Sequence, residues 1–439
     1  MKVVRLGELT AEERRRLIER HEHDFSAIEH EVAGILERVR QRGDEEIVDF
    51  YSRFLGHGAL TKERIKVYSE EIKSAYEKVP ERLVDALKVS AENIEKFHRS
   101  QLPPQLSMYE VGRGLYVGQV AKPLDSVGIY VPGGRASYPS TALMAAIPAK
   151  VANVPRVVAC TPPREDGSVD PTILVALDIV GVNEVYRVGG AHAAAALAFG
   201  TETIPRVLKI VGPGGQWFTA AKRLLMGSVS IDMVAGPSEI LIIADDSADP
   251  EFLAWDLAAQ AEHDPAASSL LLTNSKRLAE EVSRRLEAIV ESSQRGGVIR
   301  ESLSRNGMII LVDDLDEAFS FANEYAAEHV EVLADIHMTE VLSKLRNAGS
   351  ISIGPYAPVA LEDYVSGPNH ILPTSGWART RGGLSVYDYL KIISVQLGEL
   401  CGLEGLGRFA AEIAEAEGLH AHAMSIIARI KRKFQQDGF

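Results

Sequence analysis

Over the first hundred residues, hydrophobic positions recur at the spacing of amphipathic helices. One such stripe consists of Ile28, Val32, Ile35 and Val39. Gly43 and Asp44 then supply the end of one helix and the cap of the next. Charged amphipathic stretches continue to about Ser100, and Pro103 and Pro104 break the pattern. We expect helices here that serve as a scaffold or as an oligomer contact.

From Val127 onward, short apolar runs alternate with stretches of helical periodicity. The apolar runs predict strands at 127–131, 156–160, 184–188, 207–211, 239–244, 269–273, 308–312, 330–333 and 350–353. The stretches between them predict helices at 140–151, 171–180, 191–199, 216–226, 250–263, 276–292 and 315–327, and one that ends at residue 347. After Gly376 the chain returns to loop and helix, and it closes with a basic amphipathic helix at 423–434.

Alternation of strand and helix is typical of parallel sheets with right-handed crossovers. The pattern starts at residue 127 and restarts at residue 239, which predicts two doubly wound α/β units. Ligands of such folds bind at the carboxyl ends of the strands, where the loops gather. We therefore expect the functional residues in loops that follow strands.

Composition narrows the class of protein. The 439 residues predict about three domains. The net charge of -14 repels phosphate backbones and anionic lipids, so we expect no nucleic acid and no membrane as a partner. Cys160 and Cys401 are too few for a disulfide framework. The N-terminus lacks the apolar core of a secretory signal, and no apolar run is long enough to span a bilayer, so we expect a cytoplasmic protein.

Three glycine-rich loops follow predicted strands of the first unit. They are Pro132-Gly133-Gly134, Gly189-Gly190-Ala191-His192 and Gly212-Pro213-Gly214-Gly215. Glycine between a strand and a helix lets main-chain N–H groups approach an anion. None of the loops matches G-x-G-x-x-G, and the chain has no G-K-[ST] motif. Two interpretations stay open, tight turns or a site for a phosphate-bearing ligand.

Several polar residues have the chemistry of a metal or proton-transfer site. Gln260 and His263 are three positions apart, so one helix face could present both to a metal ion, although a surface histidine explains the pair as well. Glu328 and His329, where a helix meets a strand, could supply two proton acceptors or simply a charged helix end. Asp363 lies in an irregular segment rich in Pro and Gly.

A last group of polar residues lies near the C-terminus. Glu417 and His420 share one face of a helix, whereas His422 points elsewhere, so only part of this group can serve one site. By spacing alone, the sequence favours a hydrolase or a dehydrogenase with a divalent metal ion.

Nine segments, read together, resemble the histidinol dehydrogenase family. They are IYVPGG (129–134), VGGAHA (188–193), KIVGPG (209–214), IDMVAGPSE (231–239), DLAAQAEHDP (256–265), NEYAAEHVEV (323–332), EDYVSGPNHILPT (362–374), GLSVYDYLK (383–391) and AEGLHAH (416–422). They follow the family order from about residue 115 to the C-terminus. So many ordered motifs are far more specific than any single loop.

The resemblance implies an NAD-dependent zinc enzyme of histidine biosynthesis. The family oxidises L-histidinol to L-histidine through the aldehyde, in a four-electron reaction that reduces two NAD. Its fold is α/β, with two incomplete Rossmann-like parallel-sheet domains and helical N-terminal and C-terminal extensions, which explains the missing dinucleotide motif.

The resemblance also implies a domain plan and an assembly. The expected parts are an N-terminal helical arm at 1–27, a first α/β domain at 28–129 and 238–381 with most metal and catalytic residues, an inserted NAD-side domain at 130–237 and a C-terminal dimerisation segment at 382–439. The expected assembly is a homodimer in which the C-terminal segment of each subunit reaches the active site of its partner.

Family motifs also assign roles to individual residues. The implied metal ligands are Gln260, His263, Asp363 and His422, the last from the partner subunit, and a set without thiolates suits Zn²⁺ or Mn²⁺. His329 matches the base that takes the alcohol proton. Glu328 matches the residue that activates water to attack the aldehyde. Metal ligands and His329 also contact the substrate in the family.

Further matches concern the substrate and the cofactor. Ser238 and Glu417 match substrate contacts, and Glu417 suits an ammonium group. On the NAD side Tyr130 keeps the family residue, but His192 replaces a glutamine and Gly215 an asparagine. Two side-chain hydrogen bonds to NAD are therefore lost or remade.

Two other functions are considered. A paralogue with the same metal and NAD chemistry could act on another polar alcohol, such as a sulfonated diol, and Arg379 and Arg381 suit a sulfonate. A non-catalytic binding protein with this fold is the second, but it has no chemical need for Glu328 and His329 together.

Overall fold

The computed structural model describes residues 1–20, 25–56, 60–133 and 137–436. The chain forms two compact units. Residues 1–101 and 125–388 make up unit 1, and residues 102–124 and 389–439 make up unit 2. Gly134 of the first glycine loop and residues 21–24 of the predicted arm lie outside the described residues.

A six-stranded, fully parallel sheet in unit 1 has the order β1-β11-β10-β9-β12-β13. Its strands are β1 (Lys2–Arg5), β9 (Glu239–Ala244), β10 (Ser268–Thr273), β11 (Gly307–Leu311), β12 (His329–Leu333) and β13 (Ser350–Ile353). The helices around it are α1 (Ala11–Ile18), α11 (Pro250–Ala261), α12 (Lys276–Ser292), α13 (Gly296–Asn306), α14 (Leu315–Tyr325), α15 (Met338–Lys344) and α16 (Val359–Tyr364), with a 3-10 turn at Leu6–Glu8.

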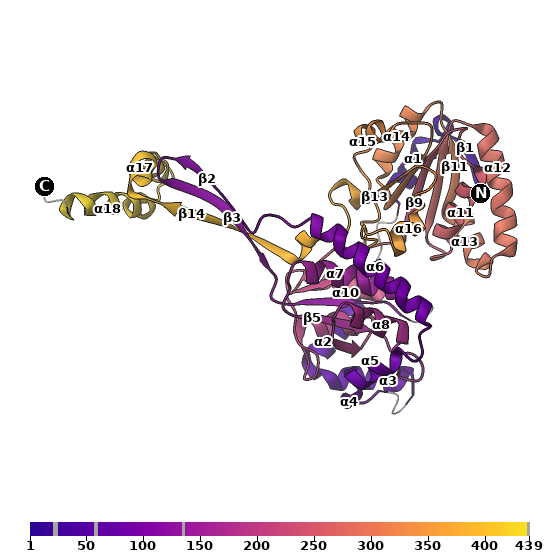
Figure 1. The fold of residues 1–439 in the computed structure, drawn as a ribbon, viewed down its shortest axis with the longest axis horizontal. Coiled ribbons are helices and arrows are strands. Elements are labelled where there is room, and N and C mark those ends of the chain that lie inside the picture. Colours follow the sequence, from indigo (N-terminus) through magenta and orange to yellow (C-terminus); the bar gives the residue numbers. More distant parts are fainter. Residues whose placement is uncertain (21–24, 57–59, 134–136, 437–439) are drawn as a thin grey trace. The chain divides into compact units, whose positions relative to one another are not determined.

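Helices cover both faces of this sheet (Figure 1). On β9, Ile240 and Ile242 point into one core, which α11, α12 and α13 close. Leu241 and Ile243 point the opposite way, into a core with α14 and α15. Because successive strand residues face opposite sides, a strand buried on both faces reads as a continuous apolar run. This explains why the run at 239–244 predicted the strand correctly.

The second parallel sheet of unit 1 has five strands in the order β6-β5-β4-β7-β8. Its strands are β4 (Val127–Tyr130), β5 (Val157–Thr161), β6 (Glu184–Arg187), β7 (Lys209–Val211) and β8 (Ser230–Ile231). Its helices are α2 (Ser26–Arg42), α3 (Asp44–Phe54), α4 (Lys62–Ile65), α5 (Ser69–Ala75), α6 (Glu81–Ser100), α7 (Pro139–Val151), α8 (Pro171–Ile179), α9 (Gly190–Phe199) and α10 (Gln216–Leu225). The predicted pair of parallel α/β sheets is confirmed.

The early helices belong to the five-stranded sheet, which moves the predicted domain boundaries. Val32, Ile35 and Val39 of α2 share one hydrophobic core with the alanine-rich helix α9 and with α10. Strand β4 pairs with β5 along its whole length and with β7 over residues 127–129, so a boundary between residues 129 and 130 would divide a strand. The insertion between β1 and β9 therefore includes residues 28–129, which the resemblance assigned to the first domain, and the start of α2 at residues 26 and 27, which it assigned to the N-terminal arm.

The N-terminal arm is also not purely helical. Lys2–Arg5 forms β1, which pairs in parallel with β11 at the edge of the six-stranded sheet. Thr10 then caps α1, and its side chain and that of Glu13 form a capping box. A strand of only four residues, mostly exposed, lacks the alternation that would have revealed it.

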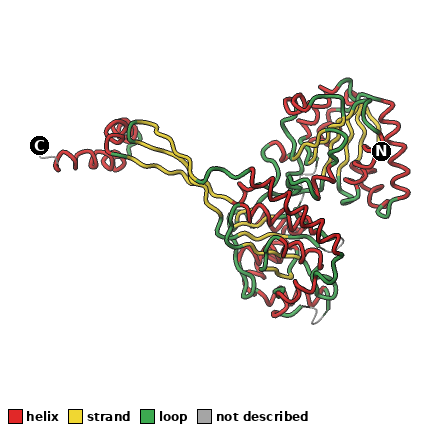
Figure 2. The backbone as a smooth tube through the Cα atoms, viewed as in Figure 1, coloured by secondary structure: helices red, strands yellow, loops and turns green. Residues whose placement is uncertain are grey.

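Unit 2 consists of an antiparallel sheet and two helices, and Figure 2 shows its long strands in yellow. The strands are β2 (Leu106–Gly112), β3 (Leu115–Pro123) and β14 (Leu390–Gly398), in the order β14-β3-β2, and the helices are α17 (Leu400–Ala416) and α18 (His420–Gln436). We had expected only loop and helix after Gly376. Two 3-10 turns, Trp377–Arg379 and Val386–Tyr389, precede β14.

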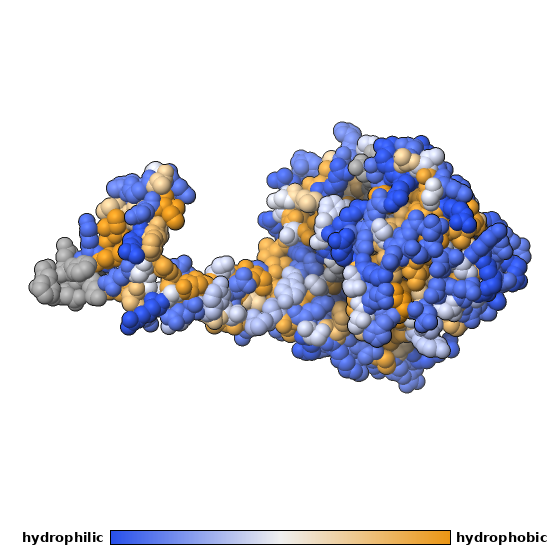
Figure 3. Space-filling model, turned by 90° about the horizontal axis from the view of Figure 1, so that it is seen from above, coloured by the Kyte–Doolittle hydropathy of each residue, from blue (hydrophilic) through white to orange (hydrophobic). Residues whose placement is uncertain are grey.

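The surface of unit 2 carries many hydrophobic side chains (Figure 3). The most exposed large ones are Leu106, Tyr109, Leu397, Phe409 and Ile413, each more than half exposed. Apolar patches of this kind usually mark a protein contact. Among the described helices none is long and apolar enough to cross a membrane.

Candidate functional site

Most predicted catalytic and metal residues lie at the amino ends of the six-stranded sheet. His329 is the first residue of β12 and is in register with Ile240 near the start of β9 and Ser350 at the start of β13. This corrects our expectation that they follow strands. The glycine loops do follow strands, since they lie after β4, β6 and β7 of the other sheet.

Glu328 is fixed by the backbone of the neighbouring strand. Its Oε2 accepts a hydrogen bond of 2.8 Å from the main-chain N–H of Glu239. The side chain is buried, and burial raises its pKa well above the usual value, helped by the charges of Glu239, Asp363 and Glu362. A carboxylate with a raised pKa is a stronger base once it is ionised.

His329 lies beside Asp363, with 3.9 Å between Nε2 and Oδ1. Burial lowers the pKa of His329 to about 3, and the charges of His370 and His263 act in the same direction. The ring is therefore neutral, and its Nδ1 has no hydrogen-bond partner within the described part of the chain. A neutral, buried imidazole with a free nitrogen can accept a proton from a bound ligand.

Asp363 lies on the short helix α16 rather than in an irregular loop as predicted. Burial raises its pKa to about 7, and the carboxylate of Glu362 raises it further. Its main-chain oxygen lies 2.8 Å from Nδ1 of His370, whose Nε2 lies 3.2 Å from Oγ1 of Thr141. Through His370, Thr141 of α7, a helix of the five-stranded sheet, is therefore linked to Asp363.

Burial raises the pKa of the Glu328, Glu362 and Asp363 carboxyls, and the charge of Glu362 raises the pKa of the other two further. A divalent cation would compensate this local negative charge and allow the carboxylates to stay ionised. Carboxylate oxygen is a donor that suits a hard or borderline metal ion, so the Asp363 side chain fits the predicted ligand set.

Gln260 and His263 lie at the end of α11. Asp249 caps this helix and Pro250 starts it, and the helix ends at Ala261, so His263 lies in the turn beyond. The amide of Gln260 is buried, and its Nε2 lacks a partner among the described side chains and backbone. His263 is exposed. A buried amide without a partner is costly unless a ligand completes its hydrogen bonds.

Within the described ranges, no three His, Cys, Asp or Glu side chains gather as a metal site. The predicted ligand set explains this. In unit 1 it contains only His263 and Asp363 of these residue types, since Gln260 is an amide and His422 belongs to unit 2.

Glu417 and His422 are both exposed residues of unit 2. The predicted shared helix face of Glu417 and His420 is wrong, because α17 ends before Glu417, Gly418 turns the chain with a φ of 74°, and α18 begins at His420. His422 lies in the first turn of α18. Nδ1 of His420 lies 2.7 Å from Oε1 of Glu415, within hydrogen-bond distance, which supports a role outside the site.

The third glycine loop is held by a buried ion pair. Nζ of Lys222 contacts Asp232 and donates a 3.0 Å hydrogen bond to the main-chain oxygen of Gly212. The N–H of Gly212 donates in turn to Oδ2 of Asp232 at 2.8 Å. The main-chain N–H and the main-chain oxygen of Gly212 are therefore both hydrogen-bonded, and this fixes the loop before α10.

The three predicted cofactor residues have different surroundings. The hydroxyl of Tyr130 accepts a 3.1 Å hydrogen bond from the N–H of Gly190, and its ring stacks on Phe218. Gly215 faces open space, because an added Cβ would meet nothing within 4 Å. The His192 ring is buried against Phe50, with 4.0 Å between the ring centroids, and burial lowers its pKa to about 4.

The glycine loop gives a matched stability test. Gly212 has a φ of 118°, and an added Cβ would lie 2.3 Å from the main-chain oxygen of Tyr130. We expect Gly212→Ala to lower the free energy of unfolding by about 2–3 kcal/mol, as both strain and a clash arise. Gly215→Ala, in open space, should cost less than about 1 kcal/mol. Urea unfolding followed by circular dichroism measures both, and equal stability of the two variants would contradict this account of the loop.

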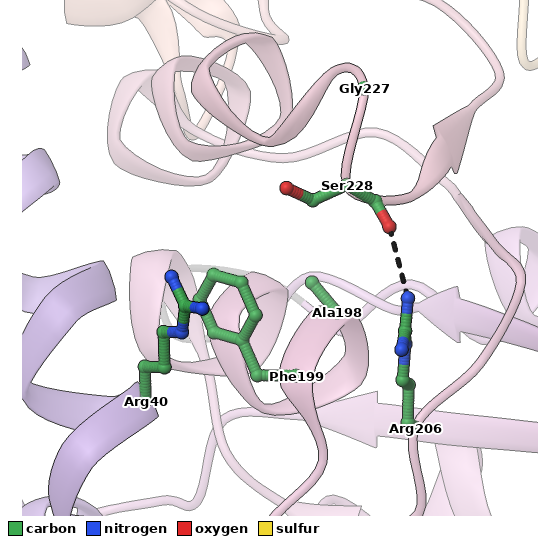
Figure 4. A pocket seen from close by; sticks show the side chains of 6 residues that line it. All are labelled: Arg40, Ala198, Phe199, Arg206, Gly227 and Ser228. Atoms are coloured by element: carbon green, nitrogen blue, oxygen red, sulfur yellow. Dashed lines mark hydrogen bonds between the residues drawn. The ribbon is translucent and has the colours of Figure 1, made fainter.

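A separate hollow of about 380 Å³ lies where α9 ends and before β7 and β8 begin (Figure 4). Its lining residues are Arg40, Ala198, Phe199, Arg206, Gly227 and Ser228. In Figure 4 the guanidinium of Arg206 points to the main-chain oxygen of Ser228, a contact of 3.3 Å. None of the predicted site residues lines this hollow.

Sequence reasoning missed some residues of the site. His370 contacts Asp363, and Glu239 holds Glu328. Both stand in the segments that carry the family resemblance, at 362–374 and 231–239, but neither has a spacing that would single it out.

Comparison with known proteins gives one consistent result. A sequence profile of the family described as histidinol dehydrogenase matches residues 18–430. The histidinol dehydrogenase of Methanothermobacter thermautotrophicus is 49% identical over 94% of this chain and 96% of its own length. That of Methanosarcina mazei is 44% identical over 97% of each chain. The crystal structure of histidinol dehydrogenase from Elizabethkingia anophelis has a TM-score of 0.93 at 35% identity and covers 98% of both chains.

Proposed function

The chain belongs to the histidinol dehydrogenase family, and from that premise we propose how its residues divide the reaction. The activity is that of an NAD-dependent alcohol and aldehyde dehydrogenase of histidine biosynthesis, acting on L-histidinol. One observation supports the division best: Glu328 and His329 are adjacent and buried at the start of β12, and they have different partners. Glu328 accepts from the N–H of Glu239, whereas His329 lies beside Asp363.

Gln260, His263 and Asp363 would hold a metal ion, Zn²⁺ or Mn²⁺, together with His422. The unpartnered amide of Gln260 and the buried carboxyl of Asp363 support this set. When bound, the cation orients the amine and imidazole of the substrate and NAD accepts hydride. We propose that these four ligand residues also contact the substrate, because the cation would hold the substrate beside them.

In the first oxidation, His329 takes the proton of the substrate hydroxyl. The neutral ring and the free Nδ1 support this role, because the base must be unprotonated before the reaction. Asp363, 3.9 Å from Nε2, favours the imidazolium that forms by its negative charge. Loss of a hydride from the alcohol carbon then leaves the aldehyde.

In the second oxidation, Glu328 takes a proton from water as the oxygen attacks the aldehyde. The N–H of Glu239 holds Oε2, and we assign the proton transfer to Oε1. The hydrated aldehyde loses a hydride, the second of the complete reaction, and becomes the carboxylate of L-histidine. One water molecule is consumed, and two NAD are reduced in the complete reaction.

Ser238 and Glu417 are proposed substrate contacts. Ser238 directly precedes Glu239 and is partly buried next to the catalytic pair. Glu417 supplies an exposed carboxylate for the ammonium group. Tyr130 and Gly215 are proposed for NAD, with main-chain groups at Gly215. For His192 only the main chain is proposed, because its ring is buried against Phe50.

The contacts of two arginines weaken the sulfonated-diol alternative. Arg379 donates to the main-chain oxygen of Glu324. Arg381 donates to the main-chain oxygen of Asp232 and pairs with Asp388 at 3.1 Å. Guanidinium groups bound to the protein in this way have fewer donors left for a sulfonate.

We propose a cytoplasmic homodimer in which unit 2 of one subunit completes the site of the other. The exposed hydrophobic residues of unit 2 support a protein contact there. The exposed positions of Glu417 and His422 support their use in another subunit's site.

Subunit mixing tests whether His422 acts in the partner's site. His422→Ala and Glu328→Gln each inactivate their homodimers for aldehyde oxidation. In a heterodimer, one of two sites regains both wild-type residues, so an exchanged equimolar mixture should recover roughly a quarter of wild-type activity. Steady-state NADH formation from L-histidinaldehyde measures this. A mixture as inactive as its parents, with exchange confirmed by mass spectrometry, would mean that His422 acts within its own subunit.

A further inference from the structure

Arg20, beyond the end of α1, forms a buried ion pair with Glu239 at the start of β9. The two are bound in a fork: Nε lies 2.9 Å from Oε1 and Nη2 lies 2.8 Å from Oε2. Both side chains are more than nine-tenths buried. Two parallel hydrogen bonds between charged groups fix direction as well as distance.

Glu239 connects this ion pair to the catalytic carboxylate. Its main-chain N–H donates the 2.8 Å hydrogen bond to Oε2 of Glu328. Its Oε1 also accepts a 3.1 Å hydrogen bond from the N–H of Ser375. Residue 239 is therefore held at its side chain by two segments, and this fixes the direction of the N–H that Glu328 uses.

The same guanidinium also holds the backbone that leads to Glu328. Nη1 of Arg20 donates to the main-chain oxygen of Tyr325 at 2.8 Å, and Nη2 lies 3.4 Å from that of Ala326. The guanidinium carbon lies 3.2 Å from the ring centre of Tyr325. Ala326 has a φ of 53°, a conformation that non-glycine residues adopt only when their surroundings impose it.

We propose that Arg20 is a positioning residue for the second oxidation, which it serves by fixing both supports of the Glu328 carboxylate. One support is the N–H of Glu239, and the other is the turn at Tyr325 and Ala326. The proposal rests on the role of Glu328 as the base that activates water. His329 has its own contact, with Asp363, so the first oxidation does not depend on Arg20 in the same way.

The role requires arginine and not merely a positive charge. Arg20 uses three nitrogens on a carboxylate and two carbonyl oxygens from two segments. The planar fork of arginine matches this geometry, whereas the single ammonium of lysine cannot make the paired contact. Arg20→Lys therefore keeps the positive charge and removes the paired hydrogen bonds to Glu239.

Arg14→Lys is the matched control. Arg14 lies on α1, and it also binds a carboxylate, Glu324 on α14, through Nε and Nη2. Like Arg20, which binds the main chain of Tyr325, Arg14 therefore attaches the N-terminal segment to α14. Unlike Arg20, it does not contact Glu239. Any effect of loosening the segment as a whole should appear in both variants.

The experiment separates the two oxidations. The rate of the first NADH formed in a single turnover of L-histidinol reports the first step, and kcat with supplied L-histidinaldehyde reports the second. For Arg20→Lys we expect kcat for the aldehyde to fall by about tenfold to a hundredfold, as a misplaced catalytic group does, while KM and the first step change less than about threefold. Arg14→Lys should leave both rates within about twofold of wild type.

An equal loss in both steps, or a loss in Arg20→Lys no larger than in Arg14→Lys, would overturn the proposal. Glu328→Gln is measured alongside. If it oxidises the aldehyde normally, the proposed role of Glu328 fails; if it is impaired and Arg20→Lys is not, only the role of Arg20 fails. Should Arg20→Lys not fold, Glu239→Gln keeps the side-chain size while losing the charge, and the same ratio of rates decides.

Discussion

Glu328→Gln should slow oxidation of supplied L-histidinaldehyde by about 10²–10⁴-fold and leave the first oxidation of L-histidinol within about threefold of wild type. Glutamine preserves the acceptor oxygen for the N–H of Glu239, so the side chain stays in place. It cannot accept a proton from water, however, and the aldehyde then accumulates. Stopped-flow absorbance of NADH, with the aldehyde trapped by semicarbazide, measures both steps.

His329→Asn should have the opposite effect, slowing the first oxidation by a similar factor. Glu331→Gln is the control, because Glu331 lies on the same strand and is equally buried but has no proposed part in the reaction. It should change neither step more than about threefold. Identical step profiles for the Glu328 and His329 variants would disprove the division of roles between them.

Removal of metal should reduce turnover to below about 1% of the untreated enzyme, and Zn²⁺ or Mn²⁺ should restore it. Without a cation the site retains the buried carboxyl of Asp363, whose pKa burial and the charge of Glu362 raise, and the amide of Gln260 remains unpartnered. Asp363→Asn and His263→Asn should bind less metal, as measured by elemental analysis of the purified chains. This second readout does not depend on activity.

His337→Asn is the control for metal content. His337 caps α15 with its ring and is none of the proposed ligands, so its replacement should leave bound metal unchanged. Full activity in protein shown to be metal-free would exclude the proposed ligand set. Unchanged metal content in the Asp363 and His263 variants would do so as well.

The sequence predicted both parallel sheets because their strands are buried on both faces. Runs such as 240–244 are apolar at every position, and the helices between them have clear periodicity. The strands of unit 2 gave no such signal. Residues 106–112 are almost entirely exposed, so no hydrophobic face distinguishes β2 from a loop. Strand β1 was missed for the same reason.

The sequence named candidate site residues, but it did not predict at which end of the strands they lie. Glu328 and His329 do lie where a helix leads into a strand, as their position in the sequence indicated. Their placement at the amino end of β12 contradicts the rule we applied to parallel sheets. That rule follows from open loops at carboxyl ends, whereas here the end of α11 and helix α16 bring polar side chains to the opposite edge.

Contacts far apart in sequence were beyond prediction. Arg20 and Glu239 are separated by 219 positions, and no local pattern pairs them. His192 stands at a helix start, where a ligand contact was a reasonable expectation. Its ring turns instead toward Phe50 and the carboxylate of Glu46, residues of α3 that only the tertiary fold brings near.

The most direct test of the account is the number of NADH molecules formed per molecule of L-histidinol under limiting substrate. A panel that includes a sulfonated diol is measured at the same enzyme concentration. We expect two NADH for each L-histidinol, L-histidine as the product and no comparable rate with the diol. One NADH with accumulated aldehyde, or faster turnover of the diol than of L-histidinol, would contradict the proposed reaction.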